Sequence, residues 1–145
     1  MAASRDMRSR RRLLSGEQLH AYGLLNKRVV FPYAGRRLSF LLSQSLFSSD
    51  DVDIGTKALL TAIAERLSDV RVKTVLDLGC GSGIIGIALS ALWPEAQVVM
   101  SDRDALSVAV SRINALENNA TEIKVIGCLS ENLIVFINQG KVTIE

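Results

Sequence analysis

Residues 74–83 of this chain read Thr74-Val75-Leu76-Asp77-Leu78-Gly79-Cys80-Gly81-Ser82-Gly83, and the apolar run Ile84-Ile85-Gly86-Ile87-Ala88-Leu89 follows them directly. An apolar segment here ends in an acidic residue and three alternate glycines, and then passes into a helical pattern. A strand-to-helix turn of this composition offers backbone N–H groups as a cradle for a nucleotide-type ligand. The stretch therefore predicts a cofactor-binding turn in an α/β fold.

The segments around this turn alternate between strand and helix patterns. Strands are predicted at 74–78, 97–101 and 122–126, and helices at 57–67, 84–92 and 104–117. The strand at 74–78 has no polar alternation before Asp77, which is typical of a strand covered on both faces. This order predicts a Rossmann-like α/β domain, with a doubly wound parallel sheet and right-handed crossovers.

Both ends of the chain depart from this alternation. Beyond Gly127, only candidate strands at 132–137 and 141–144 remain, so the sheet is expected to be incomplete at its C-terminus. Upstream, 13–25 is weakly helical, and short strands are predicted at 28–33 and 38–42 around a turn at 34–36. The predicted division is a basic disordered arm (1–12), an N-terminal extension (13–46) and a partial cofactor-binding domain (47–145).

The basic arm is the main feature of the charge distribution. Its first twelve residues hold five arginines and one aspartate, whereas the whole 145-residue chain carries only +2. Such an arm suits a polyanion such as RNA, through contacts with phosphates. A solvated, disordered terminus is the plainer alternative.

Composition excludes several other classes of protein. Hydrophobic residues make up 48% of the chain, enough for the core of one domain. Two cysteines (Cys80 and Cys128) and one histidine (His20) argue against a disulfide framework and against a metal site. No apolar run approaches the roughly 20 residues that a membrane span needs. We therefore expect a cytoplasmic protein with no metal and no membrane contact.

The glycine turn fits two cofactors, and Asp77 favours one of them. Gly81 to Gly86 match the dinucleotide pattern G-x-G-x-x-G, and Asp102 stands where a ribose-binding acid belongs, so a nicotinamide oxidoreductase is one hypothesis. A pyrophosphate over this turn would meet the like charge of Asp77. S-adenosylmethionine has no phosphate, and its ammonium group suits a carboxylate. The charge at Asp77 therefore favours S-adenosylmethionine.

The segment Val75 to Gly83 resembles the first motif of the class I S-adenosylmethionine-dependent methyltransferases. Upstream, Phe47-Ser48, Asp53-Ile54-Gly55-Thr56 and a helix containing Leu59-Leu60 resemble the lead-in of the small-domain methyltransferases. The best-known members of that family modify a guanine exocyclic amine in small-subunit ribosomal RNA. The resemblance covers about residues 36–126, and it implies S-adenosylmethionine as cofactor and RNA, above all ribosomal RNA, as substrate.

The same resemblance implies which residues contact the cofactor. The predicted cofactor-binding residues are Asp77, Gly79, Cys80, Gly81, Gly83, Asp102, Arg103, Gly55 and Thr56. In that family, Gly55 and Thr56 approach the cofactor from the side opposite the glycine turn, and the acid at the position of Asp102 holds the ribose hydroxyls. An Asn often stands at the position of Asn114.

Plainer structural roles remain open for these residues. The glycines can serve only to let the strand and the helix pack closely. Asp102 and Asp53 can each be helix caps. Cys80 is interpreted as a small buried residue, because a nucleophilic thiolate needs an activating partner. Asn114 is interpreted as structural rather than catalytic.

The acceptor side of the site departs from the family pattern. Amine methyltransferases of this family carry an Asn-Pro-Pro-aromatic tetrapeptide after the fourth strand, and this chain has prolines only at Pro32 and Pro94. Asn138, followed by Gln139-Gly140, is the catalytic candidate in its place, and Glu131 is the nearest candidate acid for contacting adenine. Methyl transfer of this kind depends on positioning and desolvation and needs no metal.

Three hypotheses follow from the sequence. The first is a methyltransferase acting on an RNA base amine, and the second is a non-catalytic cofactor- or RNA-binding module. The third is the nicotinamide oxidoreductase, which Asp77 disfavours.

Overall fold

The computed structural model describes residues 19, 23–25, 27–44, 46 and 51–127, and the backbone of 135–138 and 141–144. The predicted arm at 1–12, most of the weak helix at 13–25, Phe47-Ser48, Cys128 and Glu131 lie outside these ranges. The described elements are β1 (Lys27–Tyr33), β2 (Arg36–Leu42), α2 (Ile54–Leu67), β3 (Thr74–Leu78), α3 (Ile84–Leu92), β4 (Gln97–Asp102), α4 (Ala105–Glu117), β5 (Lys124–Gly127), β6 (Val135–Asn138) and β7 (Lys141–Ile144).

The centre of the fold is a parallel sheet in the order β3-β4-β5. Val75 of β3 lies opposite Val98 of β4, and Met100 lies opposite Val125 of β5. Val75, Val98 and Met100 are buried in one cluster with Ile87 of α3. The predicted strands and their parallel pairing are therefore confirmed, to within two residues at each end.

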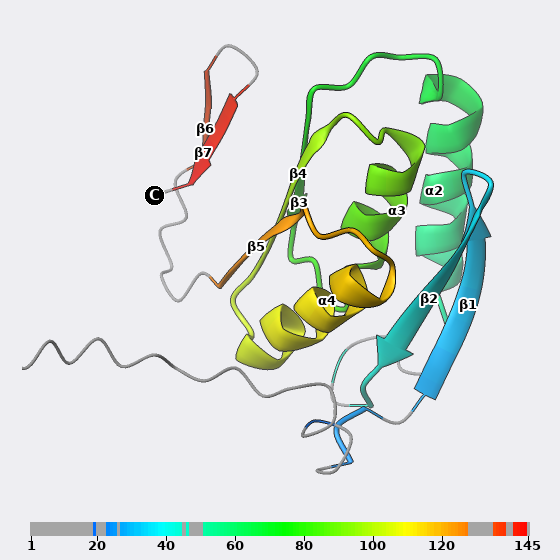
Figure 1. Ribbon diagram of the computed structural model, residues 1–145, viewed down its shortest axis with the longest axis vertical. Coiled ribbons are helices and arrows are strands. Elements are labelled where there is room, and N and C mark those ends of the chain that lie inside the picture. The colour runs from blue at the N-terminus through cyan, green and yellow to red at the C-terminus, as the bar shows by residue number, and fades with distance from the viewer. Residues whose placement is uncertain are drawn as a thin grey trace, which may run out of the picture.

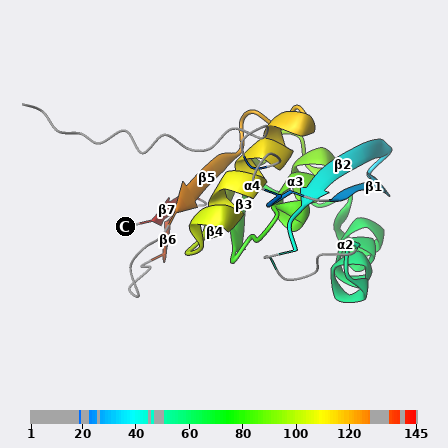
Figure 2. The ribbon, with the colours of Figure 1, turned by 90° about the horizontal axis from the view of Figure 1, so that it is seen from below.

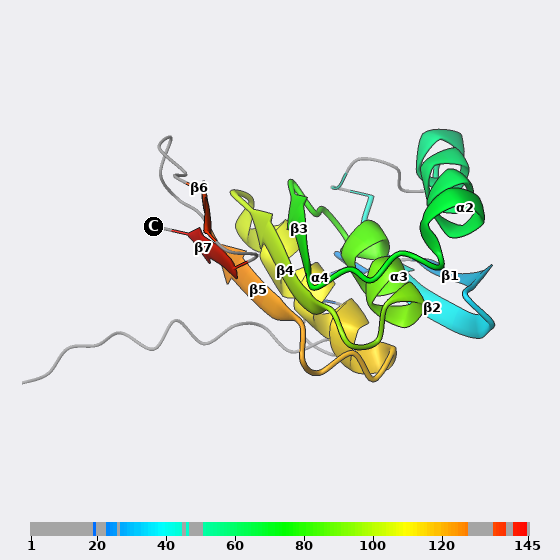
Figure 3. The same ribbon diagram turned by 90° about the horizontal axis from the view of Figure 1, so that it is seen from above.

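Helices α3 and α4 make the two crossovers of this sheet. Both crossovers step in the same direction, from β3 to β4 and from β4 to β5, so right-handed connections put both helices on the same face. The two helices contact each other there (Figure 1, Figure 3). The fold is thus the expected Rossmann-like α/β arrangement. Within the described residues, α3 and α4 cover this one face of the sheet.

The β1–β2 hairpin packs against the crossover helices (Figure 2). The strands are antiparallel, with Tyr33 opposite Arg36, and the two turn residues Ala34 and Gly35 have φ values of 49° and 72°. Positive φ at both positions gives the turn that matches the twist of a two-residue hairpin. Leu38, Phe40 and Leu42 of β2 are buried, so the hairpin shares the core of the sheet and its helices.

Helix α2 begins three residues before the predicted start, because Asp53 caps it. The Asp53 side chain accepts a hydrogen bond from the backbone N–H of Thr56. Leu60 is fully buried, but Leu59 and Leu67 are 47% and 42% exposed. The three-and-four spacing of Leu59, Leu60, Ile63 and Leu67 predicts one apolar face on the core, and the exposure of Leu59 and Leu67 shows that this prediction is wrong for these two residues. α2 packs on α3 along a narrower stripe, of which Leu60 is the only fully buried residue.

The C-terminal strands do not continue the parallel sheet. β6 and β7 pair with each other as an antiparallel two-stranded sheet, with Asn138 opposite Lys141. The candidate strands at 132–137 and 141–144 correspond to β6 and β7, which lie outside the parallel sheet. Only two residues separate β6 from β7 in the sequence, and a parallel pairing needs a crossover of a dozen or more.

Candidate functional site

The carboxyl ends of β3 and β4 meet at the glycine turn, residues 79–83. The backbone N–H groups of Gly79 and Cys80 both donate to the carbonyl of Ser101, at 2.8 and 3.0 Å. The N–H of Gly83 donates to the carbonyl of Cys80 at 2.8 Å and closes the turn before α3. The turn is thus fixed to β4, and the sequence-predicted residues Gly79, Cys80, Gly81, Gly83 and Asp102 lie together.

Asp102 holds the middle of the glycine turn. Its Oδ2 accepts a hydrogen bond from the Gly81 N–H at 2.9 Å, and its Oδ1 accepts one from the Asp104 N–H at 2.9 Å. The cap of α4 is Asp104, whose side chain accepts from the Leu106 N–H. Asp102 therefore does not serve as the α4 cap, and it presents a carboxylate at the edge where the glycine turn lies.

Asp77 is buried at the end of β3 and is bonded to the first turn of α3. Its Oδ2 accepts from the backbone N–H of Gly86 at 2.9 Å. Burial raises the pKa of Asp77, the Gly86 N–H opposes this, and the nearby charge of Asp102 raises it further. Among the residues that the structure describes, none bonds to Oδ1 of Asp77. The second oxygen of this carboxylate is therefore not engaged by the described residues.

The glycines of this region have two different roles. Gly79 and Gly81 have φ values of 70° and 54°, and an added Cβ at either would meet no atom within 4 Å. At Gly83 and Gly86, an added Cβ would come within 3.2 and 2.5 Å of the Met100 side chain. Close helix–strand packing thus explains Gly83 and Gly86. It does not explain Gly79 and Gly81, where the backbone faces open space.

Cys80 has the properties of a buried structural thiol. Only 8% of the residue is exposed, and burial raises the pKa of the thiol to about 11. A thiol with such a pKa is almost entirely protonated near neutral pH, so it is a poor nucleophile. Its contribution to the site is the backbone N–H that fixes the turn to Ser101.

Asn114 of α4 and Asn118, the C-cap residue of this helix, bind the free edge of β2. The Asn114 amide accepts from the Leu41 N–H at 2.7 Å and donates to the Leu41 carbonyl at 3.0 Å. Asn118, one helical turn later, pairs in the same way with Ser39, at 2.8 and 2.7 Å. The structure therefore confirms the structural interpretation of Asn114. For Asn118, only its i, i+4 spacing from Asn114 indicates that the two side chains lie on the same side of the helix.

The other residues predicted for the site are Gly55, Thr56, Arg103 and Asn138. Gly55 and Thr56 form the first turn of α2, which lies at the same edge of the molecule as the carboxyl ends of β3 and β4 (Figure 1). Thr56 donates to Asp53 through its backbone and its hydroxyl, and these bonds lower the pKa of Asp53. Arg103 follows β4 and is exposed. Asn138 ends β6, outside the parallel sheet.

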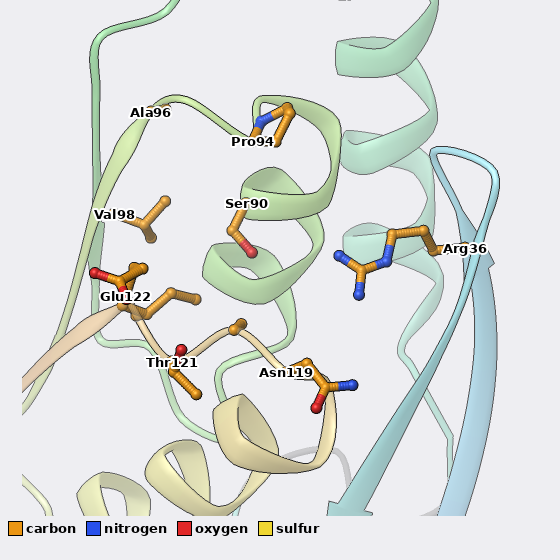
Figure 4. Close-up of a pocket in the computed structure, with 10 residues that line it drawn as sticks. Arg36, Ser90, Pro94, Ala96, Val98, Asn119, Thr121 and Glu122 are labelled. Carbon is orange, nitrogen blue, oxygen red and sulfur yellow. The ribbon is translucent and has the colours of Figure 1, made fainter.

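A pocket of about 220 Å³ lies at the opposite edge of the sheet from the glycine turn. Figure 4 shows Ser90 of α3, Arg36 of β2 and Asn119 and Thr121 of the α4–β5 connection around it. Because the lining segments lead into the amino ends of β4 and β5, the pocket is remote from Asp77 and Asp102. It contributes nothing to the glycine-turn site.

In the ranges given above, no three or more His, Cys, Asp or Glu side chains come together as metal ligands. No described helix combines the length and the apolar character that crossing a membrane requires.

The fold and the site together define a Rossmann-like domain of the class that carries an acidic strand end, a glycine turn and a second acid after the next strand. The profile of the family described as "Methyltransferase small domain" matches residues 37–134. This match spans more than half of the chain. The chain therefore belongs to the methyltransferase small domain family.

Individual relatives give the same result over part of their length. The ribosomal RNA large subunit methyltransferase G of Psychromonas ingrahamii is 36% identical over 98 residues, which are 68% of this chain and 23% of that protein. The ribosomal RNA small subunit methyltransferase C of Mannheimia succiniciproducens is 36% identical over 89 residues, 59% of this chain and 26% of that protein. The chain thus spans about a quarter of the length of these curated relatives.

A solved structure is similar in fold as well as in sequence. It is the 16S rRNA N2 G1207 methyltransferase of T. thermophilus, in complex with AdoMet and guanosine. Its TM-score is 0.60 and its sequence identity is 32%, over 72% of this chain and 28% of that chain.

Proposed function

We propose that this chain forms the cofactor-binding portion of an S-adenosylmethionine-dependent methyltransferase that modifies a base amine of RNA. The relatives are named as ribosomal RNA methyltransferases, and the similar solved structure contains AdoMet and guanosine. These points support ribosomal RNA as the substrate class and guanine as the base. A cytoplasmic location accords with such a substrate.

The observation that carries the proposal is the pair of carboxylates beside an open backbone turn. Asp77 and Asp102 flank the turn, and Gly79 and Gly81 have space in front of their Cα atoms. The Asp77 carboxylate accepts from the Gly86 N–H in the first turn of α3, the end of a helix at which a dinucleotide places its pyrophosphate, so the two negative charges would repel. The same negative charge favours the ammonium and the sulfonium of S-adenosylmethionine. The residues present therefore fit this cofactor better than NAD.

Each residue has a distinct proposed role. The free oxygen of Asp77 accepts from the ammonium, and the carboxylate of Asp102 accepts from the ribose hydroxyls while it still holds Gly81. Gly79, Cys80, Gly81 and Gly83 supply a close backbone surface. Gly55 and Thr56, at the start of α2, and Arg103, after β4, complete the cofactor's surroundings.

When bound, S-adenosylmethionine supplies a methyl group that an amine nitrogen takes up while a neutral thioether leaves. The protein's part in this step is to position the acceptor and to exclude water. Asn138 is the proposed acceptor-side residue, because its side-chain oxygen can accept an amine hydrogen and direct the nitrogen lone pair.

Calorimetric titration with S-adenosylmethionine and, separately, with NAD tests the cofactor. We expect binding of S-adenosylmethionine only, and binding of NAD alone would overturn the proposal. Incubation with labelled S-adenosylmethionine and unmodified ribosomal RNA tests the reaction. Cofactor binding without label transfer by the unchanged chain would instead identify a non-catalytic cofactor-binding module.

A further inference from the structure

We infer that Asn114 is a positioning residue that couples the β1–β2 hairpin to the cofactor turn. Besides its two bonds to Leu41, the Asn114 Nδ2 donates to the carbonyl of Ser82 at 2.8 Å. Ser82 lies between Gly81 and Gly83, two of the three glycines that give the turn its left-handed backbone. One fully buried amide therefore joins α4, β2 and the glycine turn. This inference rests on the proposed function for the ligand alone.

The bonds of Asn114 use both of its N–H donors. One goes to the carbonyl of Leu41 and the other to that of Ser82, while Oδ1 accepts from the Leu41 N–H. Ser82 is half-buried, and its carbonyl is bonded to the fully buried amide of Asn114. A hydrogen bond of this kind stabilises the orientation of the carbonyl that accepts it, so loss of the Asn114 amide should free the Ser82 peptide to rotate. A rotated Ser82 peptide would reorient the N–H groups on either side of it.

Asn118, the C-cap residue of α4, provides a matched control four residues further along the chain. It makes two bonds to Ser39 that correspond to those of Asn114 with Leu41. Its third bond goes from Nδ2 to the carbonyl of Asn114 in α4 itself, at 2.8 Å, and not to the glycine turn. The two side chains thus hold the same strand with the same number of bonds. Only Asn114 reaches the site.

The test compares Asn114→Ala with Asn118→Ala. Both variants are expected to lower the melting temperature by a similar amount, because both expose one pair of β2 backbone groups. Asn114→Ala is expected to weaken S-adenosylmethionine binding about fivefold, the value of one lost hydrogen bond, and Asn118→Ala less than about twofold. Equal losses of affinity in the two variants, or no loss in Asn114→Ala, would overturn the inference.

Amide hydrogen exchange tests the role of Asn114 independently of cofactor binding. Without any cofactor, amide hydrogen exchange at Gly81 and Gly83 should be faster in Asn114→Ala than in Asn118→Ala. This comparison holds even if the unchanged chain binds no S-adenosylmethionine, a result that would overturn the proposed function instead.

If Asn114→Ala does not fold, the unchanged protein provides the decisive comparison. Coupling between two sites is reciprocal. The Leu41 N–H donates a hydrogen bond to Asn114, and the Ser39 N–H donates one to Asn118. Cofactor binding should therefore slow hydrogen exchange more at the Leu41 N–H than at the Ser39 N–H. Equal protection at both amides would contradict the role of Asn114.

Discussion

Asp77 and Gly86 are joined by a hydrogen bond of 2.9 Å that connects the end of β3 to the first turn of α3. The first N–H groups of a helix have no partner within the helix, and a carboxylate there also interacts favourably with the helix dipole. Asp77 is therefore both a structural link and a source of negative charge in the site. These two roles can be separated, because only one of them needs the charge.

Asp77→Asn should separate them. The asparagine side-chain oxygen can still accept from the Gly86 N–H, so we expect the folded state at neutral pH to be at least as stable as in the unchanged protein. Loss of the charge should weaken S-adenosylmethionine binding about tenfold or more, as expected for a charge-assisted bond. Calorimetry and thermal unfolding measure the two effects. Asp77→Ala, which removes both roles, should lose affinity and stability together, and unchanged affinity in Asp77→Asn would rule out the ammonium contact.

The stability of the protein should depend on pH through Asp77. Its pKa is raised from 3.8 in the folded state, so the folded state binds more protons than the unfolded state just above pH 3.8. Stability from this group is then lost as the pH rises from 3.8 to the raised pKa, and is constant above it. Urea unfolding of the unchanged protein and of Asp77→Asn across this interval tests the sign. The stability of Asp77→Asn relative to the unchanged protein should increase with pH, and a decrease would contradict the raised pKa.

The parts of this fold that could be predicted from the sequence are those that depend on residues close together in the chain. The glycine turn, the capped helices and the buried strands follow from short-range patterns, and the structure has them within a few residues. The partners of polar side chains were not predictable in this way. Asn114 and Leu41 are 73 positions apart, and nothing local at either position indicates the other.

Two features that the local sequence pattern does not determine have the same physical origin. Leu59 and Leu67 have helical spacing, but the width of the stripe that α3 covers is set by tertiary packing and not by the spacing. Residues 132–137 have the sequence pattern of a strand, but this pattern does not determine with which other strand they pair. The proximity of the next strand, only two residues away, selects an antiparallel hairpin. For the site, the sequence identified both carboxylates but not that one of them also holds α3.

Cys80 should be unreactive in the folded protein. With a pKa of about 11, about one thiol in a thousand is ionised at pH 8, and the residue is buried. Alkylation by iodoacetamide at pH 8 in a Cys128→Ser background, followed by mass spectrometry, measures its reactivity. We expect little modification in the native protein and rapid modification in urea. Rapid native modification that S-adenosylmethionine does not slow would contradict the buried placement of Cys80.

Gly81→Ala and Gly35→Ala should distinguish a strained turn from a turn that holds a ligand. Gly81 and Gly35 both have left-handed backbones, with φ values of 54° and 72°, and both have open space at the Cβ position. Alanine at either position should cost about 1–2 kcal/mol of unfolding free energy, the usual cost of that conformation. The new methyl group of Gly81→Ala projects where the cofactor is proposed to approach the backbone. That of Gly35→Ala lies at the tip of the β1–β2 hairpin (Figure 1).

Urea unfolding should therefore show similar losses of stability for both variants, whereas calorimetry should show a loss of S-adenosylmethionine affinity for Gly81→Ala alone. Equal affinities would mean that the glycine turn is shaped by folding and not by the cofactor.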